Sequence, residues 1–122
     1  MTRKSILAAL GGLALAGISL YAEPAKPKSV LHVITIQWKA DAKPADIDAA
    51  IKGVEKMNYK GLTRVWTRPI KMQLPEGYKH VIVMEFESEQ ALKDYADSPA
   101  QKAWYKVYQA VREESRTHDI TN

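Results

Sequence analysis

The sequence predicts an α+β domain whose elements follow the order strand, helix, strand, strand, helix, strand. Two segments, 30–38 and 79–86, are rich in β-branched and aromatic residues, as strands are. Two prolines, Pro44 and Pro99, each open a segment whose apolar residues recur every three or four positions, as on one face of a helix. These patterns predict an antiparallel sheet with helices on one face.

An export leader is predicted before this domain. Arg3 and Lys4 precede an apolar run at 6–20, a pattern typical of a secretory signal peptide. The run is shorter than the roughly 20 residues of a membrane-spanning helix. We expect residues 1–22 to be a signal peptide that is removed on export, which makes the protein periplasmic or secreted, with retention as an N-terminal anchor as the alternative. No cysteine follows the run, so a lipid-anchored lipoprotein is excluded.

The charge of the chain without this leader is nearly balanced. Loss of Arg3 and Lys4 leaves 16 Lys and Arg (18 minus 2) against 14 Asp and Glu. Basic and acidic residues alternate instead of forming the basic patch or stripe of a nucleic-acid binder, so nucleic-acid binding is excluded. Without cysteine, no disulfide can stabilise the fold. A domain this small buries a single core, and association into an oligomer would stabilise it.

The first strand is expected at 30–38, after a charged, proline-containing linker at 23–29. His32 and Ile34 share one face of this strand, and Leu31 and Val33 share the other. Both faces are mostly apolar. A sheet covered by helices on one side only would be polar on its outer face, so both faces are predicted to be covered.

The first helix is expected at 44–57, because Pro44 suits a first helical turn. Residues 58–61 end it, and a second strand is expected at 62–67. A loop with prolines and glycine then leads to the third strand at 79–86.

A second helical region follows the third strand. Ser88 is expected to cap its start, with Leu92 and Tyr95 on the apolar face. Pro99 begins a further helical segment, and 115–120 is predicted as a last short strand.

This order is the split βαβ, ferredoxin-like arrangement, in which the first and third strands are neighbours. We expect these two strands to run parallel, so that His32 and His80, each near the start of its strand, meet at one end of the sheet. His118, near the finish of an antiparallel last strand, would reach that end too. The histidines include no closely spaced ligand pair, so no metal site is predicted.

Five short motifs also occur in the order seen in one family. They are Leu31-His32-Val33, Glu76-Gly77-Tyr78-Lys79-His80, Phe86-Glu87-Ser88, Asp94-Tyr95 and Ser98-Pro99-Ala100. On these motifs the chain resembles the Dabb family, the stress-responsive dimeric α/β barrel proteins. The resemblance implies that 30–122 is a ferredoxin-like domain whose sheet packs against that of a second copy. The product would be a homodimeric barrel with a pocket between sheet and helices in each subunit.

The resemblance also implies which residues face this pocket. By family position they would be His32, Ile36, Ile51, Val54, His80, Ile82, Tyr95 and Gln101. The functional prediction is that an exported protein of this family binds a small, largely apolar molecule in the pocket, without a cofactor.

An enzyme is the alternative. The family includes proteins that resemble polyketide cyclases, in which a pocket tyrosine acts with a histidine of a His-Pro-Ala-His element. Tyr95 matches the tyrosine, but this chain has Gln101 in place of the last histidine, and glutamine cannot accept a proton near neutral pH. The catalytic residues would then be Tyr95 with His80, or with His32. The reaction would be that of a cofactor-independent lyase, or of an aromatic or quinol monooxygenase-like enzyme.

A purely structural stress protein is the third possibility. Each histidine can simply bond the backbone or a neighbouring side chain, and the aromatic residues supply core area. Glu85 and Glu87 are expected at a solvated strand end. Arg64 and Arg68 are expected to be surface residues, with binding of an anionic ligand as the alternative.

Overall fold

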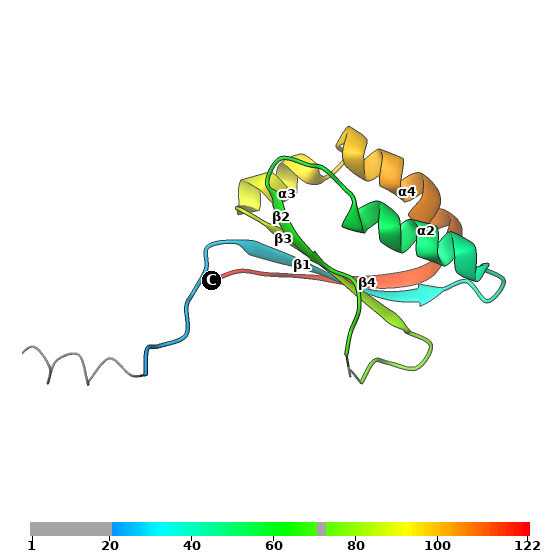
Figure 1. Ribbon diagram of the computed structural model, residues 1–122, viewed down its shortest axis with the longest axis horizontal. Coiled ribbons are helices and arrows are strands. Elements are labelled where there is room, and N and C mark those ends of the chain that lie inside the picture. The colour runs from blue at the N-terminus through cyan, green and yellow to red at the C-terminus, as the bar shows by residue number, and fades with distance from the viewer. Residues whose placement is uncertain (1–20, 71–72) are drawn as a thin grey trace, which may run out of the picture.

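The computed structural model describes residues 21–70 and 73–122. Figure 1 shows four strands in one layer and the helices in a second layer on one of its faces, which confirms the predicted α+β, ferredoxin-like class. No helix in these two ranges is long and apolar enough to span a membrane, and most of the predicted leader lies outside them. The elements are, in order, β1 (Val30–Trp38), α2 (Pro44–Glu55), β2 (Leu62–Trp66), β3 (His80–Phe86), α3 (Glu89–Tyr95), α4 (Pro99–Val111) and β4 (Arg112–Ile120).

The sheet has the strand order β2-β3-β1-β4, and every neighbouring pair is antiparallel. The expectation that the first and third strands run parallel is therefore wrong. Helix α2 returns the chain so that β2 runs in the direction of β1, and the connection from β2 to β3 reverses that direction again. Ile36 pairs with His80, whereas His32 pairs with Met84. The two histidines therefore lie at opposite ends of the pair, about 13 Å apart along the strands.

His118 does lie at the same end as His32, as expected. It pairs with Val33, however, while His32 pairs with Asp119. Because successive side chains of a strand point to opposite faces, His118 projects from the sheet face that the helices leave uncovered. The three histidines do not form one group.

The helix starts follow from local sequence. Pro44 and Pro99 occupy the first turns of α2 and α4, where a missing amide hydrogen costs no helical bond. Ser88 caps α3 by accepting a hydrogen bond from the Ala91 amide, as predicted, and Ser98 caps α4 through the Gln101 amide. These two caps fix the short connection that carries Tyr95.

Strand β4 begins at Arg112, three residues before the predicted start at Ser115. Arg112 has φ −82° and ψ 125°, so the chain passes from helix to extended strand within one residue and without a loop. Residues 112–114 are charged and carry no apolar alternation, so their place in the strand follows only from their position opposite β1.

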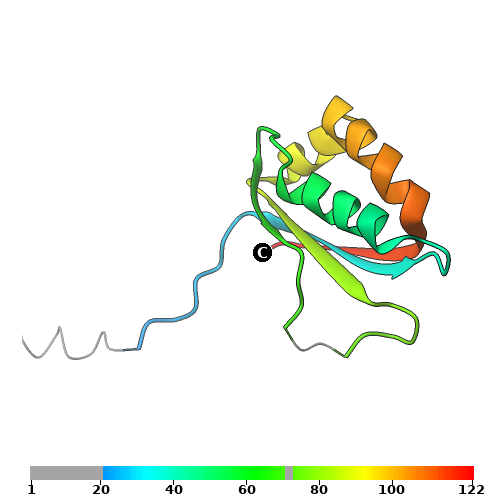
Figure 2. The same ribbon diagram turned by 45° about the vertical axis from the view of Figure 1, so that its right-hand side comes forward.

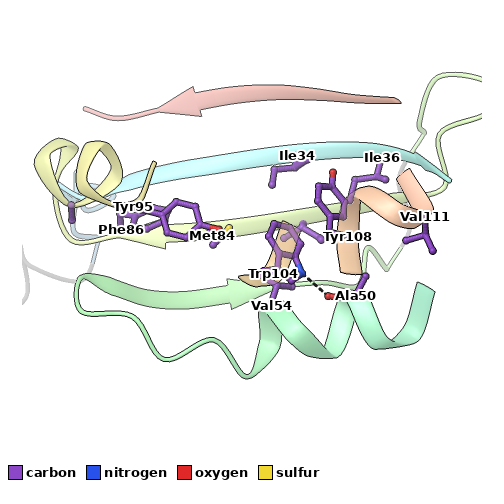
Figure 3. Close-up of a cluster of buried hydrophobic side chains, with 12 residues drawn as sticks. Ile34, Ile36, Ala50, Val54, Met84, Phe86, Tyr95, Trp104, Tyr108 and Val111 are labelled. Carbon is purple, nitrogen blue, oxygen red and sulfur yellow. Dashed lines mark hydrogen bonds between the residues drawn. The ribbon is translucent and has the colours of Figure 1, made fainter. Parts of the chain in front are cut away.

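The main core lies between α2, α4 and the helix-facing side of the sheet (Figure 3). The Trp104 ring stacks on Tyr108 with centroids 4.3 Å apart, and Trp104 Nε1 donates a hydrogen bond to the Ala50 carbonyl at 2.8 Å. Gly53 lies directly against this indole, because a Cβ placed there would be 3.0 Å from Trp104 Cδ1. A close α2–α4 contact thus depends on a residue without a side chain.

The opposite sheet face carries both apolar and ionic groups. Figure 2 shows that the connection from β2 to β3 extends on this side, away from the helices. Leu31 and Val33 are half-buried here. Glu85 is 5% exposed, so the expectation of a solvated edge is wrong for this residue. Its carboxylate accepts hydrogen bonds from Arg64 Nη2 and from Ser29 Oγ, both at 2.9 Å, and Arg64 is a surface side chain as expected.

Candidate functional site

A cavity of about 500 Å³ lies between the β1–β4 half of the sheet and helices α3 and α4. We call it the sheet–helix cavity. Val30, Ile34 and Leu92 contribute apolar surface, and the ring of Tyr108 lies on the α4 side. The polar groups come from β4, which contributes Arg112, Ser115, Thr117 and Asp119, and from His32, Tyr95, Gln101 and Tyr105. The predicted pocket between sheet and helices therefore exists, over one half of the sheet.

Three of the predicted site residues line this cavity, namely His32, Tyr95 and Gln101. The others do not. Ile36, Val54 and Ile82 belong to the solid core, each with 1% exposure or less. Ile51 is half-buried on α2. Helix α2 covers the sheet beside the cavity rather than over it, so positions on α2 pack the core instead of facing a ligand.

His80 does not line the cavity, and it is the first residue of β3. The Trp38 indole Nε1 donates a hydrogen bond to His80 Nδ1 at 2.6 Å, and the two rings meet edge to face. Burial lowers the pKa of His80 below its ordinary value, because the charged imidazolium is poorly solvated there. The structure therefore does not bring Tyr95 and His80 together.

His32 is the histidine that faces the cavity. Its Nδ1 lies 2.6 Å from Asp119 Oδ1, and the two residues are directly paired across β1 and β4. A carboxylate on Nδ1 holds the proton on that nitrogen and leaves Nε2 as the basic one. Asp119 was not among the predicted site residues. The signal that could have found it is register, because a strand antiparallel to β1 with His118 opposite Val33 necessarily places Asp119 opposite His32.

Tyr95 presents a buried hydroxyl without a partner. The residue is 2% exposed, and its Oη makes no hydrogen bond with any residue in the described ranges. Its ring packs on Phe86 and Tyr59, with centroid distances of 5.1 and 5.5 Å. Burial raises the pKa of Tyr95 far above its ordinary value, so the phenol keeps its proton and can donate a hydrogen bond at neutral pH.

Gln101 is held from two sides. Its Oε1 accepts a hydrogen bond from the Asp97 amide at 2.7 Å, and its Nε2 lies 3.3 Å from the Tyr105 hydroxyl. Asp97 has a φ of 62°, in the left-handed region that is strained for a side chain, and the Gln101 bond stabilises that turn. Gln101 thus shapes the cavity wall with amide groups that are already engaged.

The residues of the described ranges contain no cluster of three His, Cys, Asp or Glu side chains placed to hold a metal ion. The polar groups of the cavity are instead suited to an organic molecule. They offer one imidazole–carboxylate pair, phenol and hydroxyl donors, and one guanidinium above an apolar floor.

Solved structures share this fold at low sequence identity. A dimeric ferredoxin-like protein from Thermobifida fusca has a TM-score of 0.66 and 14% identity, and the match covers 84% of this chain and 96% of that chain. The hydroxynitrile lyase from Passiflora edulis has a TM-score of 0.68 and 15% identity, with 77% and 93% covered. SnoaB, a cofactor-independent oxygenase from Streptomyces nogalater, has a TM-score of 0.62 and 12% identity, with 78% and 93% covered.

The family comparison agrees with the fold. No curated protein shows significant similarity to the chain. The family described as Stress responsive A/B Barrel Domain, or Dabb, matches residues 30–122, which include every strand and helix named above. The chain belongs to the Dabb family.

Proposed function

We propose that this protein binds a small, largely apolar molecule in the sheet–helix cavity. Its volume of about 500 Å³ lies within the range of ligand sites, and its lining is apolar with a few placed polar groups. The observation that carries the proposal is the Tyr95 hydroxyl, which is buried in the cavity wall and has no hydrogen-bond partner among the described residues. An unpaired buried hydroxyl destabilises a protein unless a ligand satisfies it.

Native mass spectrometry of the protein purified from its own host tests this proposal. We expect a bound small molecule on the wild type and its loss in Leu92→Trp, because the indole would occupy space that Leu92 leaves open beside the cavity. Val107→Trp is the control, since Val107 is 43% exposed on α4 and does not line this cavity. A wild-type protein that carries no molecule and binds none from a host extract would favour the purely structural role.

A homodimer is the second part of the proposal. Leu31 and Val33 leave part of their apolar surface exposed on the sheet face without helices, and Trp66 and Ile120 are 46% and 55% exposed. The Thermobifida fusca neighbour is described as dimeric. A second copy packed on this face would cover the apolar surface on both subunits, as a barrel requires.

An enzymatic role is the alternative that a specific contact favours. The His32–Asp119 pair in the cavity wall has the arrangement of an oriented general base, with Asp119 on one ring nitrogen and the other free to accept a proton. Tyr95, which also lines the cavity, would polarise a substrate carbonyl once a side-chain movement opened its buried hydroxyl to the substrate, and no cofactor would be needed. His80 is replaced by His32 in this role, since His80 does not reach the cavity.

The neighbours suggest the first substrates to assay. An aromatic hydroxynitrile tests lyase activity, measured as cyanide release above the buffer rate, and a quinol tests oxygenase activity, measured as oxygen uptake. Activity that His32→Asn and Asp119→Asn each remove while His80→Asn retains it would support the enzyme. Equal rates for the wild type and His32→Asn would contradict a catalytic role for the pair.

Export completes the proposal. Its support is the pattern of residues 1–22, in which Arg3 and Lys4 precede the apolar run at 6–20. Mass measurement of the protein from the host's exported fraction tests this, with removal of residues 1–22 as the expected result and an intact N-terminus in the membrane fraction as the contrary one.

A further inference from the structure

We propose that the sheet–helix cavity selects an anionic amphipathic ligand, an apolar body that carries one carboxylate, and that Arg112 binds this carboxylate. The inference rests on the proposed function, because it assigns a ligand class to the same cavity. It depends on the charge of Arg112 and on the hydroxyl groups of Tyr108 and Ser115, to which a purely apolar ligand would not bind.

Arg112 is a cavity residue without a carboxylate partner. It is the first residue of β4, and its guanidinium lies 5.3 Å from the centroid of the Tyr108 ring. Its guanidinium donates a long hydrogen bond of 3.5 Å to Ser115 Oγ. Within residues 21–70 and 73–122, ion pairs form at His32–Asp119, Lys52–Asp48 and Arg64–Glu85, and Arg112 takes part in none of them.

Arg112 lies among buried groups of the cavity lining. Arg112 and Ser115 are half-buried, and Tyr108 and Ile34, which line the cavity with them, are 1% and 5% exposed. A cation without a carboxylate partner is costly where it is poorly solvated, and a ligand anion would offset that cost.

The groups around Arg112 are hydrogen-bond donors that a carboxylate would satisfy. The Tyr108 hydroxyl lies beside Ser115 and Arg112 but makes no hydrogen bond of normal geometry, although the residue is 1% exposed. Figure 3 shows the Tyr108 ring reaching from α4 toward β1. A guanidinium, a phenol and a serine hydroxyl thus lie close together in the cavity lining. A carboxylate accepts from all three at once, and bonds that involve its charge are about twice as strong as neutral ones.

The remaining lining is suited to an apolar body. Val30, Ile34 and Leu92 contribute apolar surface to the same cavity. The other charged side chains of the lining are Glu89 and Lys93, which are exposed, and Asp119, which pairs with His32. Arg112 is therefore the half-buried cation of the described lining, and it would bind the charged end of an amphipathic acid.

Titration calorimetry with a matched acid and alcohol tests the inference. Decanoate and decanol share one alkyl chain and differ only in the charged end, so they serve as probes for the purified wild-type protein at neutral pH. We expect decanoate to bind at least tenfold more tightly than decanol, as one charge-assisted contact of this kind provides. Arg112→Gln should weaken decanoate about tenfold and leave decanol unchanged, and Arg112→Lys should retain part of the preference.

The control is Lys102→Gln, which also removes one positive charge, because Lys102 is exposed on α4 and does not line the cavity. It should bind both probes as the wild type does. Equal affinities of the wild type for the two probes would overturn the anion inference and leave cavity binding intact. Failure of the wild type to bind either probe, with Leu92→Trp behaving identically, would contradict both this inference and the proposed function.

Discussion

At the scale of single residues, three buried tyrosine hydroxyls, those of Tyr78, Tyr95 and Tyr108, have no normal hydrogen bond within the described residues. Trp104, in contrast, donates its indole N–H to the Ala50 carbonyl. Buried polar atoms of native proteins are nearly always paired. Two of the three tyrosines, Tyr95 and Tyr108, line the sheet–helix cavity, so a ligand there is the partner that their hydroxyls would lack.

The first prediction concerns Tyr95→Phe. Removing a hydroxyl that is buried and unpaired should raise the free energy of unfolding of the ligand-free protein by about 1 kcal/mol, measured by urea denaturation. The same change should weaken ligand binding, so stability and function move in opposite directions. Tyr59→Phe is the control, because Tyr59 packs on Tyr95 but is only half-buried and does not line the cavity. Destabilisation of the ligand-free protein by Tyr95→Phe would show that the hydroxyl is already satisfied.

The second prediction concerns the pH dependence that Glu85 gives the fold. The Arg64 hydrogen bonds, aided by those from Ser29 and Thr63, lower the pKa of Glu85 from 4.5 to about 2. A carboxyl whose folded pKa lies below its unfolded value stabilises the protein above pH 4.5, and this contribution is lost as pH falls toward about 2.

Thermal unfolding measured at a series of pH values from 6 to about 2 tests this contribution of Glu85 to stability. Glu85→Gln should lower the midpoint temperature at pH 6, and the gap to the wild type should narrow as pH falls from about 4.5 toward about 2. Glu87→Gln is the matched control, since Glu87 is exposed and forms no ion pair in the described part of the chain. A gap of constant size over the whole range would show that charge at Glu85 contributes nothing.

Residue patterns predicted part of the site and missed part of it for identifiable reasons. Tyr95 and Gln101 were placed by the family resemblance, and His32 by that resemblance and by its position near the start of the first strand. Asp119 and Arg112 escaped because their roles depend on pairing between β1 and β4, whose register no local pattern contains. Glu85 likewise reads as a polar residue at a strand end until Arg64 is brought beside it from β2.

At the scale of elements, the sequence predicts where helices start more reliably than it predicts the direction of strands. Prolines and serine caps act within one turn, so the starts of α2, α3 and α4 were predicted closely. Strand direction depends on how many times the chain reverses, which no local pattern contains. We expected β1 and β3 to run parallel, and they are antiparallel. Because the strands are antiparallel, His80 lies at the opposite end of the pair from His32, and His32 is the histidine that lines the cavity.

The third prediction tests the α2–α4 contact at Gly53. In an isolated helix, alanine is favoured over glycine by about 1 kcal/mol. Here a Cβ would lie 3.0 Å from Trp104 Cδ1, and the indole is held by Ala50 and by its stack on Tyr108. We therefore expect Gly53→Ala to lower the free energy of unfolding by about 1 kcal/mol in spite of propensity.

A double-mutant cycle separates the two contributions. In a Trp104→Phe background the smaller ring leaves room for the new methyl group, so Gly53→Ala should become neutral or stabilising there. If Gly53→Ala stabilises the wild-type background as well, the helices have room to adjust and the close contact does not limit packing.

At the scale of the whole molecule, one face of the sheet is covered by helices and the other is not. The helix side holds the core and the sheet–helix cavity, and the other side leaves Leu31 and Val33 half-buried with Trp66 exposed nearby. A sheet that stayed uncovered would be more polar on that side. This apolar surface is the observation on which the proposed homodimer depends.

The fourth prediction addresses this partner. Sedimentation velocity at micromolar concentration should show a dimer for the wild type and a monomer for Val33→Lys, because the substitution places a charge in the middle of the apolar surface. Val107→Lys is the control, since Val107 is 43% exposed on α4, on the opposite side of the sheet, and should leave the dimer intact. A wild-type monomer would contradict the homodimer outright.

A crystal structure of the protein purified from its own host would show whether the sheet–helix cavity holds a molecule. We expect electron density for a non-protein molecule in the cavity, with an acceptor atom within hydrogen-bond distance of Tyr95 Oη and an anionic end at Arg112. A cavity that holds only water, or one closed by α3 so that the Tyr95 hydroxyl bonds to protein, would contradict this expectation.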